Sequence, residues 1–186
     1  MRIIAGSARG RSFDTKEGLA TRPTIARVKE SVFGSLQFDI PQSNVLDLFA
    51  GSGGMGLEAA SRGAAKVICN DNDAECVSII KSNAEKLDLD GIISVWRFDY
   101  REAIERLKLS GERFDIVFLD APYYENVAQD ALELLFTQGL VKEGGVVVVE
   151  HDIGSPPKPK EGLMRVKRTR KFGRCGITMM ICEDGL

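Results

Sequence analysis

Short apolar runs alternate with helical patterns through the middle of this 186-residue chain, and this alternation constrains the fold most strongly. The apolar runs predict strands at residues 45–49, 66–70, 92–98, 114–119 and 146–150. The segments between them predict helices that end near residue 62 and that span about 74–87, 100–109 and 127–136. Such alternation is typical of a doubly wound α/β fold, whose mostly parallel sheet has right-handed crossovers.

The two ends of the chain depart from this alternation. Residues 1–13 predict an irregular arm or small hairpin, and an amphipathic helix is expected from about residue 24 to residue 36. Strand-like runs at 163–170 and 177–182 are joined by too few residues for a helical crossover. They therefore predict an antiparallel hairpin at the sheet edge, which completes seven strands. We expect one domain over residues 1–186, with an N-terminal arm and helix in 1–42 and the α/β core in 43–186.

The net charge of −2 conceals two basic segments at the ends of the chain. Residues 1–29 carry a net charge of +5 and residues 156–175 one of +7, so the remainder is strongly acidic. This segregation indicates a polyanionic partner that the two ends contact. The alternative is that these charges only solvate exposed faces.

The composition argues against membrane, secreted and metal-binding proteins. No apolar run approaches the about 20 residues of a membrane helix, and the N-terminus lacks the apolar core of a signal peptide. The four cysteines form no C-x-x-C pair, which predicts reduced thiols in place of disulfides or a zinc site. We therefore expect a cytoplasmic protein that contacts no membrane and holds no metal.

A glycine-rich turn follows the first predicted strand. Gly51, Gly53 and Gly56 match G-x-G-x-x-G, in which glycines let the backbone approach a ligand closely. Asp47 precedes the first glycine, at the end of the strand. Its carboxylate would repel a pyrophosphate but suits the ammonium and sulfonium groups of S-adenosylmethionine. The motif therefore favours this cofactor over a dinucleotide.

Carboxylates end four successive strands of the predicted parallel sheet, at the edge where such sheets bind ligands. They are Asp47, Asp71, Asp99 and Asp120. Asp71 is placed to accept hydrogen bonds from ribose hydroxyls, and Asp99 from an adenine amine with Tyr100 beside the ring. Each acid alone could instead cap a following helix, as we expect of Asp73. Four in succession favour a ligand site.

The fourth strand ends in Asp120-Ala121-Pro122-Tyr123. Pro122 cannot continue a sheet ladder, so the strand ends in a stiff turn. We expect the Asp120 carboxylate and the Pro122 carbonyl to accept the two N–H groups of an exocyclic base amine, while Tyr123 stacks on the base. These bonds would aim the nitrogen lone pair at a methyl donor. The alternative is an ordinary turn with a surface tyrosine. His151, the only histidine, is expected to be structural.

Together these motifs resemble class I S-adenosylmethionine-dependent methyltransferases, and specifically the RsmD family of 16S rRNA (guanine-N2)-methyltransferases. The resemblance lies in residues 2–11, 21–24, 27–33, 47–53 and 171–173 and so spans nearly the whole chain. It implies a Rossmann-like fold, S-adenosyl-L-methionine as cofactor, and transfer of a methyl group to a guanine N2 amine in the small ribosomal subunit. The family's catalytic motif is usually Asp-Pro-Pro-Tyr or Asp-Pro-Pro-Phe, so Ala121 departs from it.

The predicted site residues form three groups. The catalytic group is Asp120, Pro122 and Tyr123. The cofactor-binding group is Arg22, Thr24, Asp47, Phe49, Gly51, Ser52, Gly53, Gly56, Asp71, Asn72, Asp99 and Tyr100. The RNA-binding group is Arg9, Arg11, Arg22, Arg168, Arg170 and Lys171. The expected partner is 16S rRNA or the small ribosomal subunit, bound by a monomer.

Three alternatives to this function remain open. The acid-x-Pro-aromatic turn cannot distinguish guanine N2 from adenine N6 in DNA or from a protein glutamine amide. A dinucleotide-binding oxidoreductase is disfavoured by Asp47 before the glycines. A non-catalytic RNA-binding module is disfavoured by the intact set of strand-end acids.

Overall fold

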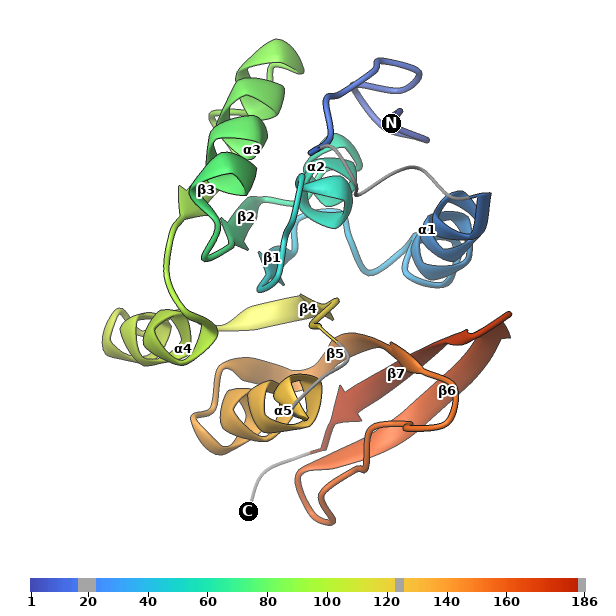
Figure 1. Ribbon diagram of the computed structural model, residues 1–186. Coiled ribbons are helices and arrows are strands. Elements are labelled where there is room, and N and C mark those ends of the chain that lie inside the picture. The colour runs from blue at the N-terminus through green and yellow to red at the C-terminus, as the bar shows by residue number, and fades with distance from the viewer. Residues whose placement is uncertain (17–22, 123–125, 184–186) are drawn as a thin grey trace.

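The computed structural model describes residues 1–16, 23–122 and 126–183. Its strands form one seven-stranded sheet in the order β3-β2-β1-β4-β5-β7-β6 (Figure 1). The strands are β1 (Asn44–Asp47), β2 (Lys66–Asn70), β3 (Ile93–Trp96), β4 (Phe114–Leu119), β5 (Val141–Asp152), β6 (Met164–Phe172) and β7 (Cys175–Cys182). The helices are α1 (Pro23–Ser35), α2 (Gly54–Ser61), α3 (Ala74–Lys86), α4 (Tyr100–Leu109) and α5 (Val127–Thr137).

The sheet is parallel from β3 to β5 and antiparallel at the β7–β6 edge. This confirms the predicted doubly wound α/β sheet with a C-terminal antiparallel hairpin. The strand order reverses direction between β1 and β4, because β2 and β3 lie on one side of β1 and the later strands on the other. A crevice forms at such a reversal, outside the carboxyl ends of the strands, and open α/β sheets bind their ligands there.

Helices cover both faces of the sheet, with α1, α2 and α3 on one face and α4 and α5 on the other (Figure 1). On the first face, Phe33 of α1 packs against Phe118 of β4 with their ring centroids 5.6 Å apart. On the second face, Ile104 of α4 and Leu132 of α5 belong to one buried cluster with Val117. Burial on both faces explains why the central strands read as continuous apolar runs. None of the helices within the described ranges has the length and apolar character needed to cross a bilayer.

The boundaries of β1, β3, β5, β6 and β7 differ from the predicted ones, and the differences in β5 and β1 bear on the site. β5 begins at Val141, five residues earlier than expected, and continues through the Gly144-Gly145 pair that predicted a turn. Its pairing with β4 shifts register between Phe114 and Ile116, and Gly144 adopts a φ of 71° beside this irregularity. A bulge of this kind keeps a glycine pair inside a strand. β1 ends at Asp47, so the two residues after it belong to the ligand-facing turn.

The N-terminal arm, residues 1–16, packs against α2. One bridge pairs Arg2 with Ser12, in keeping with the predicted irregular arm or small hairpin. The carboxylate of Glu58 in α2 accepts hydrogen bonds from the N–H groups of Ile4 and Ala5, at 2.9 and 3.0 Å. A fully buried carboxylate thus anchors the arm, because these two backbone donors satisfy it away from water.

Candidate active site

A cavity of about 1440 Å³ opens at the carboxyl ends of the parallel strands. Its lining comes from the glycine-rich turn, α1, the ends of β2 to β5 and the β6–β7 turn. The structure brings together here all four predicted strand-end acids: Asp47, Asp71, Asp99 and Asp120. Pockets for small ligands span roughly 300–1,000 Å³, so this cavity has room for a cofactor and for part of a second substrate.

The glycine-rich turn is held in place by Asp47. Its Oδ2 atom accepts the Gly56 N–H at 2.9 Å. Burial raises the pKa of Asp47 to about 7, against the opposing effect of this hydrogen bond, and the charge of Asp71 adds to the rise. Gly53 has a φ of 83°, which a residue with a Cβ rarely adopts. A Cβ on Gly56 would lie 2.3 Å from the Cys69 sulfur. The turn therefore requires these glycines, and Asp47 supports it as well as lining the cavity.

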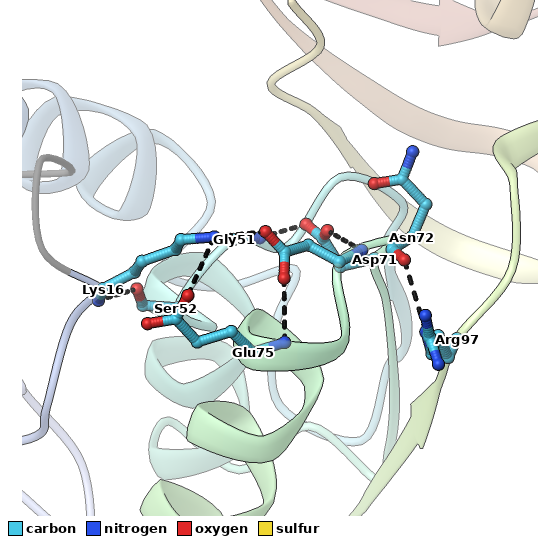
Figure 2. Close-up of polar contacts among 8 residues, drawn as sticks. Lys16, Gly51, Ser52, Asp71, Asn72, Glu75 and Arg97 are labelled. Carbon is cyan, nitrogen blue, oxygen red and sulfur yellow. Dashed lines mark hydrogen bonds and ion pairs between the residues drawn. The ribbon is translucent and has the colours of Figure 1, made fainter.

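Asp71 connects the end of β2 to the same turn. Its Oδ2 accepts the Gly51 N–H at 2.8 Å, and its Oδ1 accepts the Asp73 N–H at 2.9 Å (Figure 2). A carboxylate has about four lone-pair sites, so Asp71 can still accept hydrogen bonds from a ligand hydroxyl. Asp73 caps α3 by accepting the Glu75 N–H at 2.8 Å, and the cap prediction for this residue is confirmed.

Lys16 joins the arm to this side of the cavity, a role that the sequence did not predict. Its backbone N–H donates to the Ser52 hydroxyl at 3.0 Å, and its ammonium pairs with Asp73 and with Glu75, the latter at 3.0 Å (Figure 2). Lys16 itself lines the cavity. The predicted cofactor residue Asn72 lines it too, and its carbonyl lies 3.4 Å from the Arg97 Nε (Figure 2).

Asp99 and Tyr100 lie where β3 leads into α4. Asp99 caps α4 by accepting the Arg101 N–H at 2.9 Å, so the capping alternative holds for this acid while it also lines the cavity. The Tyr100 ring lies 5.5 Å from the ring of Phe49, and both line the cavity. The Tyr100 hydroxyl donates to Asp130 at 2.7 Å. These two rings, whose planes are inclined by 43°, give the cavity an aromatic wall.

Asn70 is a further structural residue that the sequence did not reveal. It is buried at the end of β2, and its amide donates to the carbonyls of Leu48 and Phe98 at 3.2 and 3.1 Å. Its Oδ1 accepts the Phe98 N–H at 3.2 Å. Asn70 therefore ties together the segments that leave β1, β2 and β3. The sequence signal that could have revealed this role is a polar residue at the end of an apolar run.

Asp120 ends β4 beside Glu150 of β5, and both line the cavity. The register pairs Leu119 with Val149, so the two acids are the next residues along the neighbouring strands. The pKa of Asp120 is raised above the usual range, because the surrounding protein disfavours the charged form and because Glu150 and Asp47 repel it. Asp120 is exposed to the cavity, which limits this desolvation.

The remaining predicted residues of the turn are only partly described. Ala121 is buried and Pro122 exposed, and both line the cavity. Tyr123 and Arg22 lie outside the described residues. Thr24 belongs to α1, but its side chain lies outside the described part of the chain.

Lys29 is a buried cation in the wall of the cavity. Its side chain is 4% exposed, and its ammonium lies 3.3 Å from the Glu58 Oε2. This ion pair lacks hydrogen-bond geometry, and the ammonium has no hydrogen-bond partner among the described residues. Glu58 already accepts a hydrogen bond from Arg62 at 2.8 Å. Burial lowers the pKa of Lys29. Its N–H donors therefore suit an anionic group of a ligand, which would relieve the cost of burying them.

The predicted RNA-binding residues have different surroundings. Arg11 holds the end of α3, because its guanidinium donates to the carbonyls of Lys86 and Leu87 and pairs with Asp88 at 2.7 Å. A cation at a helix C-terminus also interacts favourably with the helix dipole. Arg9 is exposed on the arm. The RNA contacts of both stay predictions.

β6 is the edge strand of the sheet (Figure 1). Its exposed residues include Arg168, Arg170 and Lys171, which we call the basic edge. Arg168 and Arg170 pair with Met179 and Ile177 of β7, whose side chains belong to the buried cluster on the α1 face. Both arginines therefore project to that face, and Arg170 donates to a hydroxyl of α1. Lys171 is exposed near the turn whose Arg174 lines the cavity. The basic edge thus leads into a turn that lines the cavity.

His151 has structural surroundings. It is buried, with Nε2 2.9 Å from the Thr178 hydroxyl and Nδ1 2.8 Å from the Asp152 carbonyl. Within the described ranges, no group of three or more His, Cys, Asp or Glu residues could hold a metal ion.

Comparison with known proteins identifies the family. A family model described as Conserved hypothetical protein 95 matches residues 1–181. Ribosomal RNA small subunit methyltransferase D of Haemophilus influenzae is 36% identical over 84% of this chain and 81% of that protein. The Escherichia coli K12 protein of the same name is 32% identical over 86% of this chain and 79% of that protein. The solved structure of yhhF from Escherichia coli matches with a TM-score of 0.87 and 26% identity over 98% of each chain. The chain therefore belongs to the RsmD family of class I S-adenosylmethionine-dependent methyltransferases.

Proposed function

We propose that this protein transfers the methyl group of S-adenosylmethionine to the exocyclic N2 amine of a guanine in 16S rRNA, within the small ribosomal subunit. The observation that carries the proposal is the meeting of Asp120 and the glycine-rich turn in one cavity. The relatives named Ribosomal RNA small subunit methyltransferase D support the substrate class. We also propose that residues 1–186 act as one methyltransferase domain, as a monomer in the cytoplasm.

The cofactor side of the cavity fits S-adenosylmethionine. Gly54 lines the cavity, and a Cβ there would meet no atom within 4 Å, which leaves open space beside the turn. The Lys29 ammonium supplies donors for the carboxylate of the methionine moiety. Asp71 supplies acceptors for the ribose hydroxyls, and Tyr100 and Phe49 supply an apolar wall for the adenine. When bound, this cofactor supplies a methyl group already activated by its positive sulfur.

The base side of the cavity fits an exocyclic amine. The lone pair of such an amine is delocalised into the base, which makes the nitrogen a weak nucleophile. Hydrogen bonds to the Asp120 carboxylate and the Pro122 carbonyl favour a pyramidal nitrogen and hold it in line with the methyl carbon. The raised pKa of Asp120 also suits it to take the proton that N2 loses after transfer.

The basic edge fits an RNA partner. Arg168, Arg170 and Lys171 are exposed on β6, next to the turn that lines the cavity. Lysine and arginine contacts to phosphates position a nucleic acid without reading its sequence. We propose that this edge, with Arg9 of the arm, holds the RNA while the target base enters the cavity.

Transfer of a labelled methyl group from S-adenosylmethionine tests the function. Unmodified small ribosomal subunits, free 16S rRNA, duplex DNA and a protein extract are offered in parallel, and the product is digested to nucleosides or amino acids. We expect N2-methylguanosine from the ribosomal substrates. N6-methyladenine in DNA or a methylated glutamine would overturn the substrate assignment and leave the cofactor assignment standing.

A further inference from the structure

Glu150 belongs to the same cavity wall as Asp120 but has no role in the mechanism above. Paired parallel strands lie about 4.8 Å apart, and the Leu119–Val149 pairing makes Asp120 and Glu150 neighbours. Phe118 and Val148, two residues before each acid, both belong to the buried cluster on the α1 face. Side chains alternate along a strand, so both carboxylates project to that face. Two acids therefore line the cavity side by side where the base would enter.

Like charges in this arrangement are unfavourable in the absence of a ligand, as the effect of Glu150 on the pKa of Asp120 shows. A ligand that donates hydrogen bonds to both carboxylates removes this cost. The Watson–Crick edge of guanine carries the ring N1–H directly beside the N2 amine. Adenine and cytosine instead carry a ring nitrogen acceptor beside their amine, and uracil has no amine. Among the four RNA bases, only guanine presents donors to both acids.

We propose that Glu150 is the specificity residue of this site and that its carboxylate accepts the guanine N1–H while Asp120 holds the adjacent N2 amine. This inference rests on the proposed function and deepens it. A carboxylate that faces an acceptor nitrogen is repelled by its lone pair, and a repulsive contact of this kind is how a polar site rejects an analogue. Glu150 therefore separates guanine N2 from adenine N6, which the Asp-x-Pro-aromatic turn cannot do.

The test replaces the target guanine with 2-aminopurine, which keeps the exocyclic amine but has an acceptor at N1. 16S rRNA is joined from a synthetic segment that carries either base at the methylated nucleotide, and it is reconstituted into small subunits. We expect wild-type kcat/KM to be at least about 10²-fold lower on 2-aminopurine than on guanine. In Glu150→Gln the amide can accept from guanine N1 or donate to 2-aminopurine N1. We therefore expect the two substrates to differ by less than about tenfold.

Asp152→Asn is the matched control, because Asp152 lies two residues further along β5, lines the same cavity and undergoes the same change of charge. Its carboxylate accepts the Gly154 N–H at 2.8 Å, and we expect it to keep the wild-type preference for guanine. Binding of S-adenosylhomocysteine by calorimetry verifies that each variant is folded.

The outcomes separate the two proposals. Wild-type protein that methylates 2-aminopurine as well as guanine would overturn the role of Glu150 without any variant. A Glu150→Gln protein that loses activity on both bases equally, with the preference unchanged, would show that Glu150 acts only through Asp120. Wild-type protein that fails on the guanine-containing subunit would instead overturn the proposed function.

Discussion

The cofactor side and the base side of the cavity use their carboxylates differently. On the cofactor side, Asp47, Asp71 and Asp99 each accept a backbone N–H from the glycine-rich turn or from the first turn of a helix. On the base side, Asp120 and Glu150 lie beside each other on adjacent strands and repel. Acids that accept backbone N–H groups make a preformed cradle, whereas a ligand that brings two donors would relieve the repulsion between the neighbouring acids. Carboxylates thus build the site on one side and, in the proposed role of Glu150, select the base on the other.

The largest effect is expected from a substitution that changes the base side of the cavity and leaves the cofactor side intact. Asp120→Ala removes the acceptor for the amine, and loss of this positioning is expected to slow methyl transfer by at least about 10²-fold. The affinity for S-adenosylhomocysteine should stay unchanged, since Asp47, Asp71 and Asp99 accept the backbone N–H groups of the cofactor cradle. Single-turnover transfer and calorimetry measure the two quantities. Normal transfer in this variant would remove Asp120 from the mechanism.

The second prediction concerns the buried acid of the cradle. The pKa of Asp47 is raised to about 7 from an unfolded value near 4, so the native protein holds a proton in this range that the unfolded chain has lost. The unfolding free energy of the cofactor-free protein therefore falls as the pH rises between these values. Each pKa unit corresponds to about 1.4 kcal/mol.

Asp47→Asn keeps an oxygen for the Gly56 N–H but cannot titrate. Urea unfolding at about pH 5 and about pH 8 should show a smaller loss of stability in this variant than in the wild type. An equal loss of unfolding free energy in both proteins would show that another titrating group causes the pH dependence.

The third prediction concerns the cation of the cofactor side. Lys29→Met removes the donors proposed for the cofactor carboxylate, and we expect about tenfold weaker binding of S-adenosylhomocysteine. A decarboxylated analogue should bind the variant and the wild type equally. Lys16→Met is the control, because Lys16 lines the cavity but is already paired with Asp73 and Glu75. If Lys29→Met loses the same affinity for both ligands, Lys29 acts only as the ion-pair partner of Glu58 and not as a donor to the cofactor carboxylate.

The smallest effect is expected at the basic edge. Charge reversal at Arg168 and Arg170 removes phosphate contacts, so RNA binding should weaken several-fold and its salt dependence should become shallower by about one contact per residue. Reversal of Lys108, exposed on α4 of the opposite face, is the control. RNA binding that is unchanged at several salt concentrations would show that these arginines are only solvated surface charges.

Much of the fold followed from local patterns. β2, β4 and α4 begin and end at the predicted residues, because burial on both faces makes a strand a continuous apolar run and a strand-end acid marks the helix start. The capping role of Asp73 was predictable for the same reason, since its partner is two residues away.

The residues that escaped prediction depend on distant partners. Lys29 meets Glu58 only because α1 packs beside α2, and Asn70 contacts Phe98 across two strand ends. In the sequence, Glu150 is simply the last residue of a predicted apolar strand, and no local pattern marks it as a ligand-binding residue. Its place beside Asp120 depends on the register between β4 and β5, which a bulge near Phe114 shifts.

The sequence by itself determined the fold class, the family, the cofactor turn and the acids at the strand ends, because each is encoded by residues close together along the chain. Only the tertiary structure decided which acids serve the scaffold and which face a ligand. That division depends on which backbone donors, cations and other acids the packing brings to each carboxylate. Segments distant in sequence supply several of these neighbours, and no local pattern specifies them.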